Sequence, residues 1–548
     1  MEGLPPLTIT KWLLAFLPIF TVLVLMIWFK WSGGKSGALS WFIAIAMAIV
    51  FFGANIKTIA MGTVKGLWTT VFVLYIIWGA MILYQVVDIS GGFKVISKTF
   101  SRLTNGNRAI QLLTLGFAFP TFIQGVLGFG APVAIAAPLL VGIGFSPVVA
   151  AASALIGHAW AVTFGSLGSS YSVLITQTGA MKSAAAAYQV AVFSVIPIAI
   201  AGFFTPWALV HMYGGMKALR ENWQGILVMG LTMVGASLIM VLFVTPYVAS
   251  FAAGIFGLLV GAFVLPRLPA YKNSAIEDEA PEETSLEEAP DPKNISFNTA
   301  FSGYYALIIV VFAIYLTPLK QFLNQFGNIG LFTLTTETAY GYILEGEKAY
   351  SAFNLLTSPG TLIFVSTFVA YLIYKNKGLW PEQGLQRVFK GATRQAIGAT
   401  ITVMTMSMMA VVMLQTGMTS LLAFGTAEAT GGAYPLFSAF VGELGAFMTG
   451  SNTNSNILFT MFQYDVAKFL SISIPIILGL QTTGGAVGNM ISPMNVALGT
   501  GSANCVGKEG EILKKTLIYA IIIGLAVGTA GWFLEFVIFP NHQWLLPL

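Results

Sequence analysis

The chain of 548 residues has few of the groups on which soluble enzymes and metalloproteins depend. A single cysteine, Cys505, excludes an intrachain disulfide. One cysteine and three scattered histidines cannot form a metal cluster, so we expect no metal and no cofactor. Charged residues make up 9% of the chain, against roughly a quarter in soluble domains, whereas hydrophobic residues make up 56%. This composition excludes a soluble fold.

The chain is rich instead in long apolar runs. A bilayer core about 30 Å thick requires roughly 20 apolar residues per helix, and helices are the form that such runs take in lipid. The first run, Trp12–Phe29, is flanked by Lys11 and Lys30 without a small-residue cleavage site, so we interpret it as a retained span rather than a signal peptide. Continuous spans are predicted at about residues 12–30, 38–54, 66–87, 184–209, 223–245, 247–265, 299–317, 358–374, 395–415 and 515–539.

Charge in the loops predicts the orientation of these spans. Residues 88–108 hold four basic residues against one acid, and residues 375–394 hold five against one, so both loops are predicted to be cytoplasmic. The segment from Glu277 to Asp291 holds eight carboxylates and no basic residue, which favours a solvated linker over a catalytic cluster. The formal net charge of +5 is spread over loops and indicates contact with the lipid bilayer, not with nucleic acid.

Two apolar regions, residues 109–183 and 435–505, are interrupted by Gly, Pro, Ser, Thr and Asn. Transporters whose helices break at mid-membrane depth show this pattern. The two regions align at a constant offset of 320, and chance matching among 58 glycines is the weaker explanation. The aligned pairs are Gly125 with Gly445, Gly130 with Gly450, Thr163 with Thr483, Gly165 with Gly485 and Gly168 with Gly488.

The charge pattern indicates that these repeats are inverted. At the same offset, the basic loop 88–108 corresponds to residues 408–428, which contain Glu428 and no Lys or Arg. We therefore predict an all-α polytopic membrane protein with two inverted repeats, each containing a re-entrant hairpin and a broken helix. The predicted divisions are a first repeat over 1–222, linking helices and the acidic linker over 223–298, and a second repeat over 299–548.

The centre of each interrupted region carries an unusual motif. Gly125–Pro132 places three glycines before a proline, which predicts a non-helical hairpin tip that opens into a helix N-terminus. Thr449–Asn456 places seven hydroxyl or amide side chains in eight positions between apolar flanks. Helix N-termini bind anions, and hydroxyl and amide groups can ligate a 2-hydroxyl, so we predict a site for a small carboxylate. Packing of helices by small residues is the alternative.

A second matched pair of motifs follows the tips. Thr163–Ser170 and Gln481–Asn489 are each predicted to be a helix that unwinds at mid-span and faces the tips, with Ser492 and Pro493 restarting the chain. The predicted substrate-binding residues are Gly128, Gly130, Ala131, Gly165, Ser169, Ser170, Ser451, Asn452, Thr453, Asn454, Ser455, Asn456, Thr482, Thr483 and Gly484.

Six segments carry a resemblance to a known family, namely Gly128–Ile135, Thr336–Tyr340, Thr449–Asn456, Thr482–Gly485, Met490–Pro493 and Val506–Glu509. They resemble the L-lactate permease family, and the resemblance covers nearly the whole chain. It implies symport of lactate, and often glycolate, with protons across a prokaryotic plasma membrane. The wider ion transporter superfamily, which this family resembles in its paired hairpins, further implies an elevator-like transport domain that moves against a scaffold.

Four positions depart from the family pattern. The family usually has Glu where this chain has Gln124 and Asp where it has Asn452, so two acids are replaced by amides. Glu443 stands where the family tends to be apolar, and His158 where it tends to have Asn. An ionisable group at the bilayer centre costs roughly 2.5–3.5 kcal/mol, so we interpret Glu443 as the leading proton carrier. His158 is the second, because imidazole changes charge near neutral pH; a histidine bonded to a helix carbonyl is the alternative.

Three other functions are weighed against this one. Sodium-coupled anion transporters resemble the chain in Ser451–Thr453, but they repeat the triplet at both tips, whereas the first tip here reads Ala131–Val133. An intramembrane enzyme needs a nucleophile and a base, for which Ser169 or Ser170 with His158 is the candidate set. A passive channel is disfavoured because the polar residues cluster at two sites and do not line a continuous path.

Overall fold

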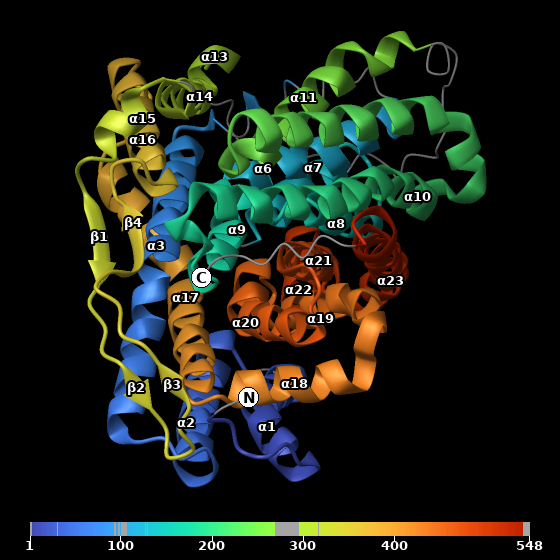
Figure 1. The fold of residues 1–548 in the computed structure, drawn as a ribbon. Helices are drawn as coiled ribbons and strands as arrows, with labels where there is room; N and C mark the ends of the chain where they lie inside the picture. The colour runs from blue at the N-terminus through green and yellow to red at the C-terminus, as the bar shows by residue number, and fades with distance from the viewer. Residues whose placement is uncertain are drawn as a thin grey trace.

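The computed structural model describes residues 3–540 apart from residues 30, 93–94, 97–98, 100–106, 127, 129, 269–294 and 316. Most of the described residues are helical (Figure 1), and each predicted continuous span corresponds to a helix. The spans at 184–209 and 223–245 both belong to α10, which bends at Gly214 and Gly215. The predicted acidic linker, from Glu277 to Asp291, lies outside the described residues.

The helices follow one another in two groups that flank the undescribed linker. The first group comprises α1 (Ile9–Ile27), α2 (Gly33–Phe51), α3 (Ile56–Ile89), α5 (Arg108–Gln111), the π-helix η1 (Leu112–Ala118), α6 (Phe119–Val126), α7 (Ala131–Gly142), α8 (Pro147–Ala159), α9 (Gly165–Gln177), η2 (Ala180–Lys182), α10 (Ala184–Phe243), η3 (Pro246–Val248), α11 (Ala249–Phe263) and η4 (Leu265–Arg267). The second comprises α13 (Phe297–Ala300), α14 (Ser302–Tyr315), α15 (Leu319–Leu323), α16 (Pro359–Asn376), α17 (Gly384–Gln415), α18 (Met418–Thr430), η5 (Gly431–Ala433), α19 (Tyr434–Thr449), α20 (Asn452–Leu470), α21 (Ile474–Gly488), η6 (Asn489–Ile491), α22 (Pro493–Ser502), α23 (Glu509–Phe533) and η7 (Leu534–Ile538). In the described part of the chain, nine helices are long and apolar enough to cross a membrane, as expected of a multi-pass membrane protein.

The two helices α3 and α17 run side by side along one edge of the molecule (Figure 1), and we call them the long-helix pair. Glycines let their backbones approach closely. A Cβ added to Gly66 of α3 would lie 2.7 Å from the Cα of Met408 in α17. Helix α2 packs on α17 in the same way through Gly37, close to Thr405. Small residues at the contact are the usual means by which membrane helices associate.

The segment that joins α15 to α16 departs from the predicted all-α fold. It forms two antiparallel two-stranded sheets, one of β1 (Asn328–Leu331) with β4 (Tyr350–Asn354) and one of β2 (Thr336–Glu337) with β3 (Ile343–Leu344). The pairing of β1 with β4 is irregular between Ile329 and Leu331. This segment lacks the 3.6-residue apolar period of a helix and contains glycine turns, so its backbone groups pair between short strands. The all-α prediction is wrong here.

The two interrupted regions contain the same order of elements. In the first, α6 and α7 meet at a tip and are followed by α8, a break and α9; in the second, α19 and α20 meet at a tip and are followed by α21, a break and α22. We call these eight helices the hairpin bundle. The second break lies at Asn489–Ser492, because α21 stays helical through Gly488. The predicted unwinding within Gln481–Gly488 is therefore wrong. These glycines serve packing, since a Cβ on Gly484 would lie 1.8 Å from the carbonyl oxygen of Ala439.

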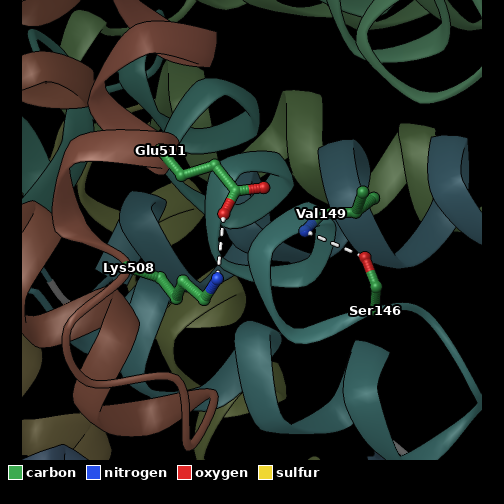
Figure 2. Close-up of polar contacts among 4 residues, drawn as sticks. All are labelled: Ser146, Val149, Lys508 and Glu511. Carbon is green, nitrogen blue, oxygen red and sulfur yellow. Dashed lines mark hydrogen bonds and ion pairs between the residues drawn. The ribbon is translucent and has the colours of Figure 1, made fainter.

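Within the hairpin bundle, helices from the two regions pair with each other. Helix α8 packs on α22, where a Cβ on Gly499 would lie 3.4 Å from the Cβ of Ala151, and α9 packs on α20. Figure 2 shows the N-terminal end of α8 together with the start of α23. There Ser146 caps α8 by accepting a hydrogen bond from the Val149 amide at 3.4 Å, near the Lys508–Glu511 ion pair of 3.6 Å at the start of α23.

Candidate functional site

A small cavity of about 20 Å³ lies where the two tips and the two helix breaks meet. Among the described residues that line it, all but one are polar or glycine, and none is Lys, Arg, Asp or Glu. The lining comprises Gln124, Gly128, Gly130, His158, Val162, Ser166, Ser169, Ser170, Gly450, Ser451, Asn452, Thr453, Asn489 and Asn495.

The first tip contributes backbone and empty space to the cavity. Gly130 adopts φ +86° just before α7, a left-handed conformation that favours glycine. A Cβ on Gly130 would lie 2.3 Å from Leu498, and one on Gly128 would lie 2.2 Å from the Oγ of Ser166. Gly128 and Gly130 of the tip motif are therefore needed, because a side chain at either position would clash with a neighbouring residue. The absence of a side chain at Gly128 also leaves space beside the Ser166 hydroxyl.

The first helix break carries an unusual backbone. Ser166, Leu167 and Gly168 have φ values of 47°, 50° and 74°, so three successive residues lie in the left-handed region. This conformation costs roughly 1–2 kcal/mol for each non-glycine residue. It directs the next two residues toward the second tip: the Thr453 Oγ1 lies 3.0 Å from the Ser170 Oγ and 3.4 Å from the Ser169 Oγ. Strain of this kind is concentrated at functional sites.

The second tip brings a helix N-terminus to the cavity. Gly450 ends α19 with φ +67°, and Ser451 then caps α20 by accepting a hydrogen bond from the Asn454 amide at 3.3 Å. The free amide groups of the first turn and the helix macrodipole give this end of α20 a partial positive charge. The cavity wall is thus electropositive without a basic side chain.

Two asparagines of the second tip tie the halves of the molecule together. The Nδ2 of Asn452 donates to the Oγ1 of Thr163 at 3.1 Å and to that of Thr482 at 3.2 Å. The Nδ2 of Asn456 donates to the same Thr482 hydroxyl at 2.9 Å and to the Ser170 carbonyl at 3.1 Å. Asn452 lines the cavity, whereas Asn456 and Thr482 stand behind it.

Several predicted site residues lie beside the cavity without lining it. Ser455 donates to the Gly442 carbonyl at 2.7 Å, and Thr483 donates to the Gly479 carbonyl of its own helix at 2.7 Å, so both hydroxyls are engaged within the hairpin bundle. The predicted residues outside the lining are Ala131, Gly165, Asn454, Ser455, Asn456, Thr482, Thr483 and Gly484. Those within it are Gly128, Gly130, Ser169, Ser170, Ser451, Asn452 and Thr453.

Three positions are considered for proton coupling: the predicted carriers Glu443 and His158, and Gln124, which stands where the family usually has an acid. Gln124 and His158 line the cavity, and the imidazole Nδ1 is 2.8 Å from the Ala154 carbonyl oxygen one turn earlier in α8. Glu443 is 5% exposed and does not line the cavity. Its carboxylate faces α23, because a Cβ on Gly524 would lie 2.2 Å from its Oε1, and this oxygen has no hydrogen-bond partner among the residues that the structure describes.

The cavity also contains residues outside the predicted set of substrate-binding residues: Val162, Ser166, Gly450, Asn489 and Asn495. Of these, Ser166, Gly450 and Asn489 lie within the motifs, whereas Val162 and Asn495 do not. The two asparagines form a clamp, because the Nδ2 of Asn495 donates to the carbonyls of Gly450 at 3.2 Å and Asn489 at 3.0 Å. A buried amide within an apolar segment was the available signal for both residues. Their meeting with Gly450 depends on tertiary packing.

Comparison with known proteins gives concordant matches. A sequence profile described as L-lactate permease matches residues 11–538. The glycolate permease GlcA of Escherichia coli (strain K12) is 28% identical, and the alignment covers 94% of each chain. The L-lactate permease of Halalkalibacterium halodurans is 26% identical, with 94% of this chain and 95% of the relative covered. Among solved structures, the YdaH transporter of Alcanivorax borkumensis is 14% identical with a TM-score of 0.47, covering 87% of each chain.

Proposed function

The chain belongs to the L-lactate permease family, and from this premise we propose that it couples the uptake of L-lactate, D-lactate or glycolate to protons across a prokaryotic plasma membrane. Membership of a permease family identifies a transporter rather than an enzyme, which excludes the intramembrane hydrolase weighed from Ser169, Ser170 and His158. Relatives named for L-lactate and for glycolate support a small 2-hydroxy acid as the substrate.

The observation that carries this proposal is the chemistry of the cavity lining. The N-terminus of α20 and hydroxyl groups such as that of Thr453 would stabilise a carboxylate, and the described lining residues include no acidic side chain that would repel it. The amide of Asn489 and the hydroxyls of Ser166 and Ser169 suit a neighbouring 2-hydroxyl. The single imidazole among the described lining residues can pair with one carboxylate, which favours a monocarboxylate over a dicarboxylate.

Proton coupling is the finer part of the proposal, and the position of His158 in the cavity lining supports His158 as the proton carrier. The ring of His158 lines the cavity, so a protonated imidazole there pairs directly with a bound carboxylate. The pair carries no net charge, which lowers the cost of moving the substrate through a low-dielectric core. Glu443 is the second candidate, acting from the contact with α23 behind the cavity.

We also propose that the two interrupted regions are inverted repeats in an elevator-like transport domain. In the hairpin bundle, helices of the two repeats pair with each other, α8 with α22 and α9 with α20. This cross-pairing is the arrangement expected of helices that enter from opposite sides of the membrane. The long-helix pair then serves as the scaffold along which the hairpin bundle moves.

One observation favours sodium as an alternative coupling ion. The Oδ1 atoms of Asn452, Asn454 and Asn456 are buried and have no hydrogen-bond partner in the described part of the chain. Unpaired amide oxygens fit a hard cation as well as a substrate hydroxyl. Measuring whether uptake depends on sodium distinguishes a bound sodium ion from a substrate hydroxyl as the partner of these oxygens.

Purified protein in proteoliposomes tests the proposal. We expect labelled L-lactate to enter by counterflow, glycolate to compete with it, and succinate not to compete. An imposed inward proton gradient should drive accumulation in sodium-free buffer. Absence of lactate counterflow would contradict the substrate, and accumulation that requires sodium would contradict the coupling ion.

A further inference from the structure

Val162 is the one apolar side chain among the described residues that line the polar cavity. It lies in the first helix break, between α8 and α9, and its side chain is 8% exposed. A valine offers no hydrogen-bond partner to a carboxylate or a hydroxyl group. A ligand group that contacts Val162 must therefore be apolar for the contact to be favourable.

The backbone on either side of Val162 is anchored to other helices. The Ala161 carbonyl accepts a hydrogen bond from the Ser250 hydroxyl of α11 at 2.7 Å. On the other side, the Thr163 hydroxyl donates to the Thr482 carbonyl of α21 at 3.0 Å. Ser250, Thr163 and Thr482 are all buried, and a β-branched side chain has few rotamers. A bound substrate therefore meets the Val162 side chain in a fixed position.

The break places Val162 between groups that suit the other parts of a 2-hydroxy acid. His158, Val162 and Ser166 line the cavity at intervals of four residues. A protonated imidazole pairs with the carboxylate, and the Ser166 hydroxyl, beside the space left by Gly128, suits the 2-hydroxyl. The remaining substituent on C2 is a methyl group in lactate and a hydrogen atom in glycolate. This substituent is the part of the substrate that an apolar side chain recognises.

We propose that Val162 receives the methyl group of lactate and thereby sets the preference of the site among 2-hydroxy acids that differ at C3. Glycolate has no methyl group to bury against this valine. Glycerate, which carries a hydroxyl on C3, places a polar group against an apolar side chain and loses affinity for that reason. This inference rests on the proposed function and names the residue that selects among its substrates.

The test measures competition against uptake of labelled L-lactate by proteoliposomes, first with wild-type protein. L-Lactate should bind roughly four- to tenfold more tightly than glycolate, as expected for the burial of one methyl group, and about tenfold more tightly than glycerate. This comparison changes the ligand and not the protein, so it does not depend on the folding of a variant. Equal inhibition constants for L-lactate and either competitor would overturn the role of Val162.

Two variants then test the residue itself. Val162→Thr keeps the shape of the side chain and replaces one methyl group by a hydroxyl group. It should reduce the preference for L-lactate over glycerate roughly tenfold, because the new hydroxyl offers the C3 hydroxyl a hydrogen-bond partner. Val162→Ala opens space beside the substrate methyl group and should improve the binding of 2-hydroxybutyrate relative to L-lactate. A gain for a second substrate is a result that partial misfolding does not produce.

Val173→Thr is the matched control, because Val173 in α9 is also buried but does not line the cavity. It should keep the wild-type preferences. Unchanged preferences in folded Val162→Thr or Val162→Ala overturn this inference and leave the proposed function intact, since the wild type still takes up lactate. Absence of lactate uptake by the wild-type protein overturns both.

Discussion

The two hairpins that meet at the cavity are held by different forces. In the first, glycines and aromatic rings pack α6 on α11: a Cβ on Gly125 would lie 2.4 Å from the Cα of Phe251, and one on Gly254 would lie 2.3 Å from the Cα of Phe122. The Phe122 and Phe251 rings are 5.5 Å apart. The first hairpin is thus held by close steric packing, and it contributes backbone atoms and open space to the cavity.

The second hairpin is fixed by a chain of buried amides and hydroxyls. Tyr434 and Ser438 donate to the Oε1 of Gln463, whose Nε2 donates to Gln481 at 2.8 Å. The Nε2 of Gln481 donates in turn to the Ser455 Oγ at 3.1 Å. Buried polar groups are costly when a partner is removed, whereas close packing is costly when atoms are added. Substitutions should therefore act by steric clash in the first hairpin and by lost hydrogen bonds in the second.

The largest loss of stability is expected at a close glycine contact that both halves of the molecule contain. A Cβ on Gly157 would lie 1.8 Å from the Gly116 carbonyl oxygen, as one on Gly484 would from that of Ala439. Because the contacted atom belongs to the backbone and something must shift to admit the methyl group, Gly157→Ala and Gly484→Ala should each lower the free energy of unfolding by roughly 1–3 kcal/mol or more and reduce the yield of folded protein. Detergent extraction and size-exclusion chromatography provide the measurement.

Gly398→Ala is the control for these variants, because no atom lies within 4 Å of the added Cβ. It should fold like the wild type. A monodisperse Gly157→Ala or Gly484→Ala protein with the melting temperature of the wild type would show that this contact is looser than the structure indicates.

The next prediction compares the roles of two titratable groups in proton coupling, His158 in the first half and Glu443 in the second. His158 lines the cavity and Glu443 faces α23, so His158→Gln should abolish accumulation of lactate driven by a pH gradient but keep lactate exchange, which needs no net proton movement. Glu443→Gln should retain at least part of the accumulation. If Glu443→Gln loses accumulation and His158→Gln keeps it, the proton is carried by the second half, as first inferred from the sequence.

A smaller effect, a change in KM for lactate, is expected from substitutions at the two tips. Asn452→Ala removes an amide that donates to Thr163 and Thr482 at the cavity wall and should raise KM for lactate roughly tenfold to a hundredfold. Gln124→Ala at the first tip should change KM less, because that tip contributes mainly backbone. Uptake kinetics at matched protein density measure both values. Equal effects at the two tips would contradict the difference drawn between them.

The smallest effect lies within the second hairpin, away from the cavity. Ser455→Ala removes the hydroxyl that donates to Gly442, and should lower the free energy of unfolding by roughly 1–3 kcal/mol with little change in KM. Thermal melting and uptake kinetics separate the two quantities. Thr483→Val, which removes a hydroxyl bonded only to its own helix, should cost less. A strongly raised KM in Ser455→Ala would place this residue in the site.

Much of this organisation could be predicted from local patterns. Apolar runs of sufficient length located the membrane helices, and the run from Thr449 to Asn456 located the second tip. The offset of 320 between the repeats predicted the wrong position for the second break. Gly484 and Gly485 could mark either an unwound turn or a close contact between helices, and the sequence is the same in both cases. The strands β1–β4 were missed because each is five residues or fewer.

The amino-acid sequence by itself determined that this protein lies in a membrane, that two of its segments are too polar and glycine-rich for simple spans, and that its relatives are lactate and glycolate permeases. Those properties depend on composition and on short motifs. Only the tertiary structure decided which polar groups share a cavity. Thr163 meets Thr482 and Ser170 meets Thr453 across separations of about 300 residues, and such contacts are set by the packing of whole helices, which no local pattern encodes.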